Sequence, residues 1–218
     1  MTLPRKAASE FIGTALLLAA VVGSGIMGER LAGGNVAVAL LANAIATGAV
    51  LIALILTFAP ISGAHFNPLV TIADASQGGA SWRDVLAYVP AQVFGAVAGV
   101  ACANTMFGEP VFAWSSRART GFPQALSEAV ATFGLLSVIG GCAKRRPDAV
   151  AFAVGAYITG AYWFTSSTSF ANPAVTVARA LTDTFSGIRP ADVPMFLLAQ
   201  VVGATAATLY FRWLFSKD

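Results

Sequence analysis

Six long apolar runs constrain this chain more than any other feature of its sequence. They cover roughly residues 8–27, 36–58, 85–107, 123–143, 149–166 and 193–215. A helix needs about 20 mostly apolar residues to cross about 30 Å of hydrocarbon. Charged residues make up 11% of the chain, whereas soluble domains carry about 25%. We therefore expect an all-α membrane protein that forms a single domain over residues 1–218, and a water-soluble globule is excluded.

Two further apolar segments are too short to cross a bilayer. One begins at Asn67 and runs to about Ala75, and the other begins at Asn172 and runs to about Leu181. Each is about half a bilayer long. Irregular backbone at membrane depth is tolerated only where it is buried in protein or lines a cavity. The two segments therefore predict re-entrant half-helices around a pore or a transport site.

The two halves of the sequence resemble each other. Three motifs recur in the same order, about 105–118 residues apart: Ser-Glu at Glu10 and Glu128, Asn-Pro at Asn67 and Asn172, and Ala-Gln at Gln92 and Gln200. Each half holds three expected spans, an odd number, so the halves cross the membrane in opposite directions. The sequence predicts an inverted repeat with units of about 5–108 and 122–215, whose half-helices meet near the midplane.

The basic residues predict the orientation. Six spans put both termini on one side, together with eight of the thirteen basic residues: Arg5, Lys6, Arg83, Lys144, Arg145, Arg146, Arg212 and Lys217. Loops rich in Lys and Arg stay in the cytoplasm. We expect a multi-pass protein of the inner (plasma) membrane with both termini in the cytoplasm.

The Asn-Pro pairs predict how the centre works. Asparagine is a favoured helix N-cap, and proline suits the first helical position. Each half-helix would point its partly positive N-terminus and its amide N–H donors at one central spot. Such a site suits neutral acceptors such as water and polyols and repels cations and protons. The expected pore motif is Asn67, Pro68 and Leu69 with Asn172, Pro173 and Ala174.

Two acidic residues, Glu10 and Glu128, lie inside apolar spans, where a charge is costly. We expect each carboxylate to accept hydrogen bonds from backbone N–H groups of a re-entrant loop, because those groups have no water to bond. A proton relay is the alternative. Gln92 and Gln200 are expected to support the loops in the same way.

The run from Ser62 to Thr71 and the second Asn-Pro-Ala motif resemble the major intrinsic protein family, the aquaporins and glycerol facilitators. The resemblance covers essentially the whole chain and includes the paired glutamates. It implies a bundle of six tilted helices with two half-helices, embedded in the lipid bilayer as a homotetramer with one pore per subunit. It also implies that His65 lines the cytoplasmic end of the pore. Asp74 is expected to anchor its loop.

The resemblance also implies a four-residue selectivity filter. Counting without gaps from Asn67 and Asn172 gives these positions: Thr47, Gly160, Ser169 and Val175. Val175 stands where the family nearly always has arginine, and all four residues are small, so we expect a wide filter without a fixed cation. Arg179, one helical turn later, either brings a guanidinium to the outer mouth or lies at the membrane surface or pairs with Asp183.

These features predict a passive channel for water and small uncharged solutes such as glycerol, urea and metalloid hydroxides, and the resemblance extends the candidates to organic arsenicals. A gated secondary transporter and a water-only channel with a collapsed filter are the alternatives. We expect no enzyme activity, because no nucleophile–base pair is visible, and no cofactor. One histidine excludes a multi-histidine metal site, and the scattered basic residues give nucleic-acid binding no support.

Overall fold

The computed structural model describes residues 1–216, so Lys217 lies outside the described part of the chain. Within that part the fold is all-α, as predicted. The helices are α1 (Leu3–Leu31), α2 (Val36–Ser62), α3 (Pro68–Ser76), α4 (Trp82–Met106), α5 (Phe122–Arg145), η1 (Pro147–Ala149), α6 (Val150–Phe164), α7 (Pro173–Arg179), η2 (Pro190–Asp192) and α8 (Val193–Leu214).

The six expected spans correspond to α1, α2, α4, α5, α6 and α8, with bounds that differ by a few residues. Five of these six are long and apolar enough to cross a membrane. The exception is α6, which has 15 residues. It ends early because Thr165 takes an extended conformation, and the chain leaves the helix to run into the bundle.

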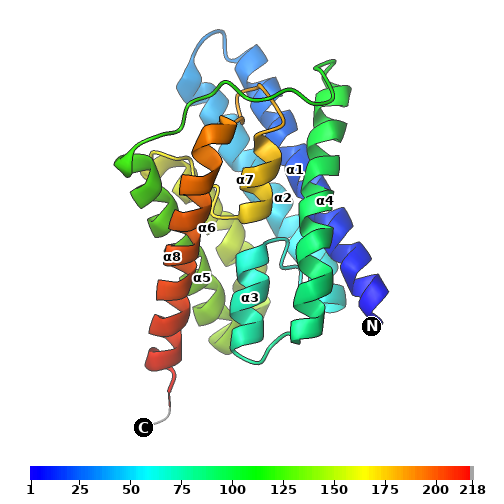
Figure 1. Cartoon of the computed structure of the whole chain (residues 1–218), viewed down its shortest axis with the longest axis vertical. Helices are drawn as coiled ribbons and strands as arrows, with labels where there is room; N and C mark the ends of the chain where they lie inside the picture. Colours follow the sequence, from blue (N-terminus) through cyan, green and yellow to red (C-terminus); the bar gives the residue numbers. More distant parts are fainter. Residues whose placement is uncertain (217–218) are drawn as a thin grey trace.

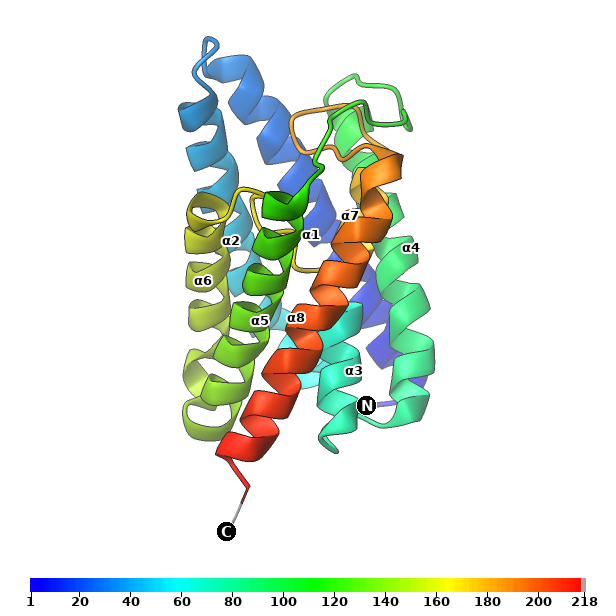
Figure 2. The ribbon, with the colours of Figure 1, turned by 60° about the vertical axis from the view of Figure 1, so that its left-hand side comes forward.

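The long helices surround the two short ones, α3 and α7 (Figures 1 and 2). Helix α1 packs along α4, α5 packs along α8, and α2 contacts α6. Helix α1 begins and α8 ends at the same end of the bundle (Figure 1), which we call the lower end. The opposite end, where α1 ends and α8 begins, is the upper end.

The two half-helices start near the middle of the bundle and run apart (Figure 1). Helix α3 runs to the lower end and α7 to the upper end. Asn67 caps α3 by accepting a hydrogen bond from the Leu69 N–H at 3.0 Å, and Asn172 caps α7 through the Ala174 N–H at 3.0 Å. Both positive helix ends therefore face the centre. The repeat bounds near 5–108 and 122–215 stay a prediction.

Glycine allows the paired helices to approach closely. A Cβ added at Gly95 of α4 would overlap the Phe11 carbonyl oxygen of α1, and one added at Gly203 of α8 would overlap the Ala129 carbonyl oxygen of α5. Membrane helices associate through such contacts between small residues, because apolar side chains gain nothing by leaving lipid. The same device thus joins α1 to α4 and α5 to α8.

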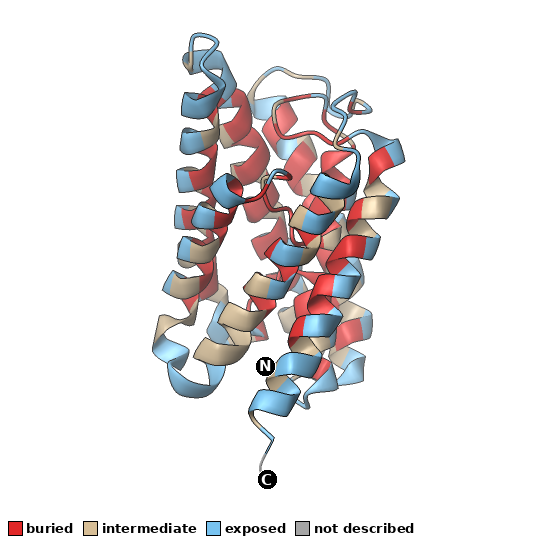
Figure 3. Cartoon of the chain, turned by 90° about the vertical axis from the view of Figure 1, so that its left-hand side faces the viewer, coloured by how far each residue is buried: buried red, intermediate tan, exposed pale blue. Residues whose placement is uncertain are grey.

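Buried residues lie on the inward faces of the helices and exposed ones on the outside (Figure 3). The exposed residues include large apolar side chains such as Leu86, Phe94 and Phe122. The interior instead holds fully buried polar side chains, among them Glu10 and Gln92. An apolar outside around a polar inside is the pattern that a lipid environment requires.

Candidate functional site

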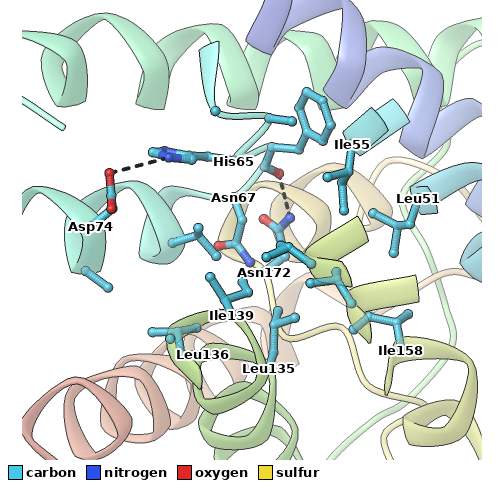
Figure 4. A pocket seen from close by; sticks show the side chains of 18 of the residues that line it. Leu51, Ile55, His65, Asn67, Asp74, Leu135, Leu136, Ile139, Ile158 and Asn172 are labelled. Carbon is cyan, nitrogen blue, oxygen red and sulfur yellow. Dashed lines mark hydrogen bonds and ion pairs between the residues drawn. The ribbon is translucent and has the colours of Figure 1, made fainter. Parts of the chain in front are cut away.

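A cavity of about 520 Å³ runs through the bundle from the lower end to the upper ends of α6 and α7. One side is formed by aliphatic side chains, which we call the apolar wall: Leu51, Ile55, Leu135, Leu136, Ile139, Val154 and Ile158. Asn67 and Asn172 lie opposite part of this wall (Figure 4). In this part of the cavity the two asparagine amides therefore face aliphatic side chains.

The two asparagines tie the re-entrant loops to each other. The Asn67 amide donates to the Ala171 carbonyl oxygen at 2.8 Å. The Asn172 amide donates to the Phe66 carbonyl oxygen at 2.7 Å, the bond drawn at Asn172 in Figure 4. An amide NH₂ group has two N–H donors. One donor of each asparagine therefore holds the opposite loop, which the sequence did not reveal, and the second remains for a molecule in the cavity.

Glu10 holds the loop that precedes α3. Its carboxylate accepts hydrogen bonds from the backbone N–H groups of His65 at 3.0 Å and Phe66 at 2.7 Å. It also accepts from the Ser62 hydroxyl at 2.6 Å and the Gln92 amide at 2.8 Å. Both carboxylate oxygens are thus engaged with the loop and its supports.

Glu128 holds the loop that precedes α7 in the same way. It accepts hydrogen bonds from the Phe170 N–H and the Ala171 N–H, each at 2.9 Å, and from the Gln200 amide at 2.6 Å. Gln200 also donates to the Thr176 hydroxyl at 2.8 Å. The sequence had left loop support and proton relay open. In the structure both oxygens of Glu128 accept from the loop or from Gln200, which is the loop-supporting arrangement.

These bonds hold a backbone that is locally unfavourable. Ala64 and Phe66 have φ of 51° and 49°, and Ser169 and Ala171 have φ of 51° and 49°. The left-handed region costs a non-glycine residue about 1–2 kcal/mol. The hydrogen bonds from adjacent N–H groups to the carboxylates offset that cost. They stabilise the left-handed backbone conformation of the loops.

His65 lines the lower part of the cavity, and Asp74 of α3 lies beside it (Figure 4). The His65 Nε2 atom is 3.6 Å from the Asp74 Oδ2 atom, and the His65 Nδ1 atom is 3.1 Å from the Thr71 hydroxyl oxygen. Asp74 was expected only to anchor its loop, but it also lines the cavity. It lies one helical turn after Val70, which also lines the cavity.

Three of the four expected filter residues line the cavity, and one does not. Thr47, Ser169 and Val175 line it, whereas Gly160 is exposed on the outside of α6 with nothing within 4 Å of an added Cβ. Tyr162 lines the cavity instead, with its hydroxyl 3.2 Å from the Thr47 hydroxyl oxygen.

The reason is helical periodicity. Val154, Ile158 and Tyr162 recur every four residues, so they share the inner face of α6. Gly160 lies two residues from Ile158, on the opposite face. Ungapped counting from Asn172 missed this, because it fixes a residue number and not the helix face on which that residue lies.

Arg179, the last residue of α7, lines the upper part of the cavity and is 2% exposed. Its guanidinium carbon lies 3.5 Å from the centroid of the Phe170 ring, and its Nε donates to the Ser186 carbonyl oxygen. Neither of the other two expected positions of Arg179 matches this placement. Burial excludes a place at the membrane surface, and Asp183 instead accepts from the Ser116 N–H at 2.8 Å. That bond holds the pKa of Asp183 below its ordinary value.

A second arginine, Arg119, lies near the same ring and was missed by the sequence reasoning. It comes from the loop between α4 and α5, and its guanidinium carbon is 5.0 Å from the Phe170 centroid. It donates to the carbonyl oxygens of Gly187 at 2.8 Å and Ser167 at 3.0 Å. Burial, with a smaller effect of Arg117, lowers the pKa of Arg119 to about 10, so the residue stays protonated at neutral pH. No local motif could have announced this contact.

The described residues offer no group of three His, Cys, Asp or Glu side chains that could hold a metal ion. What the cavity offers instead is a file of hydrogen-bonding groups beside an apolar wall. Such a surface offers hydrogen bonds to the polar atoms of a small molecule and contact to its apolar atoms.

Comparison with known proteins agrees with this geometry. The sequence matches the major intrinsic protein family over residues 1–150 and 143–218. It is 53% identical to the aquaglyceroporin AqpS of Rhizobium meliloti over 97% of this chain and 91% of the relative. It is 33% identical to "Probable aquaporin AqpM" of Archaeoglobus fulgidus, over 98% of both chains.

The fold is similar to the crystal structure of the aquaglyceroporin from Plasmodium falciparum, with a TM-score of 0.76 and 22% identity over 96% of both chains. The matching sequence, the matching fold and the paired Asn-Pro half-helices agree. The chain belongs to the major intrinsic protein family, which consists of membrane channels rather than enzymes.

Proposed function

We propose that the chain forms a passive pore for water and small uncharged solutes. The observation that carries this proposal is the cavity between the apolar wall and the two asparagines. Each asparagine keeps one N–H donor for an acceptor oxygen, and the wall contacts the carbon side of the solute. Two half-helix N-termini give the centre a positive potential, which disfavours cations and protons.

Glycerol and urea are the solutes we propose first, and uncharged metalloid hydroxides are of similar size. The name of the relative AqpS supports glycerol. Thr47, Ser169 and Val175 are small, which supports a wide passage, but Tyr162 fills more space than the glycine expected on α6. The passage is therefore narrower on the α6 side than four small residues would make it.

The two glutamates favour a channel over a secondary transporter. A coupled transporter needs a group that binds and releases its ion. Both oxygens of Glu10 and of Glu128 already accept hydrogen bonds from the loops. Neither carboxylate could change partners without loosening the loop it holds.

We also propose a homotetramer in the inner membrane with the lower end in the cytoplasm. Exposed apolar side chains on the long helices support contact with lipid and with other subunits. The basic run Lys144-Arg145-Arg146 lies at the lower end, where loops of a cytoplasmic face carry such residues.

Stopped-flow light scattering on proteoliposomes tests the pore. Shrinkage under an impermeant osmolyte measures water permeability, and reswelling under glycerol or urea measures solute permeability. We expect the wild type to pass all three, and Val175→Arg to lose glycerol and urea while keeping water. Val175→Leu separates charge from size and should keep glycerol. A wild type that passes only water would contradict the wide passage, and one that passes nothing would contradict the pore.

A further inference from the structure

The upper part of the cavity holds two polar groups whose hydrogen-bonding capacity is not filled within the described residues. Ser169 is 3% exposed, and its hydroxyl has no hydrogen-bond partner in the described structure. Within residues 1–216 the Arg179 guanidinium makes one hydrogen bond, from Nε. Both side chains line the cavity. A buried hydroxyl without a partner is costly, so these groups are placed to meet a molecule that enters the cavity.

The guanidinium is held in a fixed position. It stacks on the Phe170 ring at 3.5 Å, and the Nε bond to Ser186 fixes the plane of its fork. An arginine has five N–H donors. With one used, the two terminal nitrogens keep theirs. A planar, preorganised fork suits ligands that present two oxygen atoms in one plane.

The charge here is not neutralised by the protein. Among the described residues neither Arg179 nor Arg119 forms an ion pair with a carboxylate, although both lie near Phe170. An intramembrane cation is expensive and normally faces a counter-charge or a water-filled cavity. The unmatched positive charge therefore faces whatever occupies the upper part of the cavity.

The cavity also ends at this level. Residues from the loops 107–121 and 180–192 do not line it, so Arg179 belongs to the last layer before the upper surface. A solute that has passed Asn67 and Asn172 from below meets Arg179 next. Val175 lies one turn nearer the centre, and its apolar side chain leaves the guanidinium without a competing partner.

We infer that Arg179 and Ser169 form a binding subsite for small planar oxyanions at the upper end of the cavity. The inference rests on the proposed pore, because Arg179 and Ser169 line the same cavity through which its solutes pass. The guanidinium would hold two oxygens of the anion, and the Ser169 hydroxyl would donate to a third or to the same pair. The subsite thus gives the pore an affinity that its neutral solutes do not require.

Nitrate is a suitable probe, because it is planar, monovalent and has no membrane-permeant acid form at neutral pH. Glycerol permeability of proteoliposomes would be measured in nitrate and in gluconate at equal ionic strength. We expect nitrate to lower glycerol flux in a saturable way, whether the anion then passes or returns. In Arg179→Gln the nitrate concentration that halves the flux should rise by about tenfold or more, since a charge-assisted bond is lost.

Three further variants separate the subsite from general charge effects. Ser169→Ala should weaken the nitrate effect less than Arg179→Gln, and Arg179→Lys should fall between them because it keeps charge without the fork. Arg117→Gln removes a nearby exposed charge that does not line the cavity, so its nitrate response should equal that of the wild type.

The outcomes distinguish this inference from the pore itself. Glycerol flux that is equal in nitrate and gluconate would overturn the subsite and leave the pore standing. A nitrate effect of the same size in Arg179→Gln would overturn it too. Absence of glycerol and water flux in every variant would instead contradict the proposed pore.

Discussion

The loops before α3 and α7 share one scaffold but carry opposite chemistry. Each loop gives two adjacent backbone N–H groups to a buried glutamate and ends in an asparagine that caps a half-helix. At the residue two before each asparagine the first loop has His65 and the second has Phe170. At the residue seven after it, α3 has Asp74 and α7 has Arg179.

The difference shows which parts of the repeat are constrained. Backbone groups inside a membrane must find partners, so the glutamates and the capping asparagines recur in both halves. Side chains that face the cavity are not needed for these backbone hydrogen bonds, so they can differ between the two halves. The lower end has therefore acquired an acid beside a histidine, and the upper end has acquired a cation on an aromatic ring. The hydrogen bonds that support the two loops are therefore alike, whereas the side chains that line the two ends of the cavity differ in charge.

Removing the shared scaffold should produce the largest effect. Glu10→Ala and Glu128→Ala each leave two buried N–H groups without an acceptor, at about 1–3 kcal/mol per group. We expect both variants to unfold at clearly lower temperature in detergent and to lose water permeability. Glu109→Ala, at an exposed ion pair, serves as the control. An intact fold in only one of the two variants would break the equivalence of the loops.

Removing the charge at the upper end should come next. Arg179→Gln removes a cation from the uppermost layer of the cavity. Two unit charges about 4 Å apart in a partly buried setting interact with about 4 kcal/mol, so Arg179 repels a proton at that distance by about this amount. We expect proton permeability, followed by a pH dye inside the liposomes, to rise by at least about tenfold. Unchanged proton permeability with normal water flux would assign the whole barrier to the half-helices and asparagines.

Two variants of α6 test whether Tyr162, and not Gly160, lies beside the passage. Tyr162→Ala opens space beside Thr47, so glycerol and urea permeability should increase by several-fold. Gly160→Ala adds a methyl group on the outside of α6, where nothing lies within 4 Å of the Cβ, and should leave permeability unchanged. The reverse result would return Gly160 to the filter.

The smallest effect is expected at the lower end. The side chain of Asp74 is 42% exposed, and its Oδ2 atom is 3.6 Å from His65 Nε2. A contact of this length to a partly exposed carboxylate contributes at most about 1 kcal/mol. Asp74→Asn should therefore shift the free energy of unfolding by less than about 1 kcal/mol and leave glycerol flux within about twofold of the wild type. A larger change in glycerol flux would show that Asp74 influences permeation, contrary to this expectation.

Much of the fold could be predicted because its signals are local. Hydropathy located the spans, and Asn-Pro marked where each half-helix begins. The failures come from side-chain direction and distant contacts. Counting from Asn172 gave the residue number of Gly160 but not the helix face on which it lies, and that face does not line the cavity. Arg119 reaches Phe170 from a loop about fifty residues away in sequence, and no periodicity or motif connects them.

The reciprocal bonds of the two asparagines also constrain how the molecule is made. They join residues 104 and 106 positions apart in the chain. Contacts of such sequence separation form slowly, because closing a long loop has an entropic cost that local contacts do not have. During synthesis the first half emerges well before Asn172 exists. The loop before α3 therefore lacks its hydrogen-bond partners in the loop before α7 until the second half has been made, and the centre of the pore is completed only then. A chain whose synthesis stops halfway thus leaves no finished passage in the membrane.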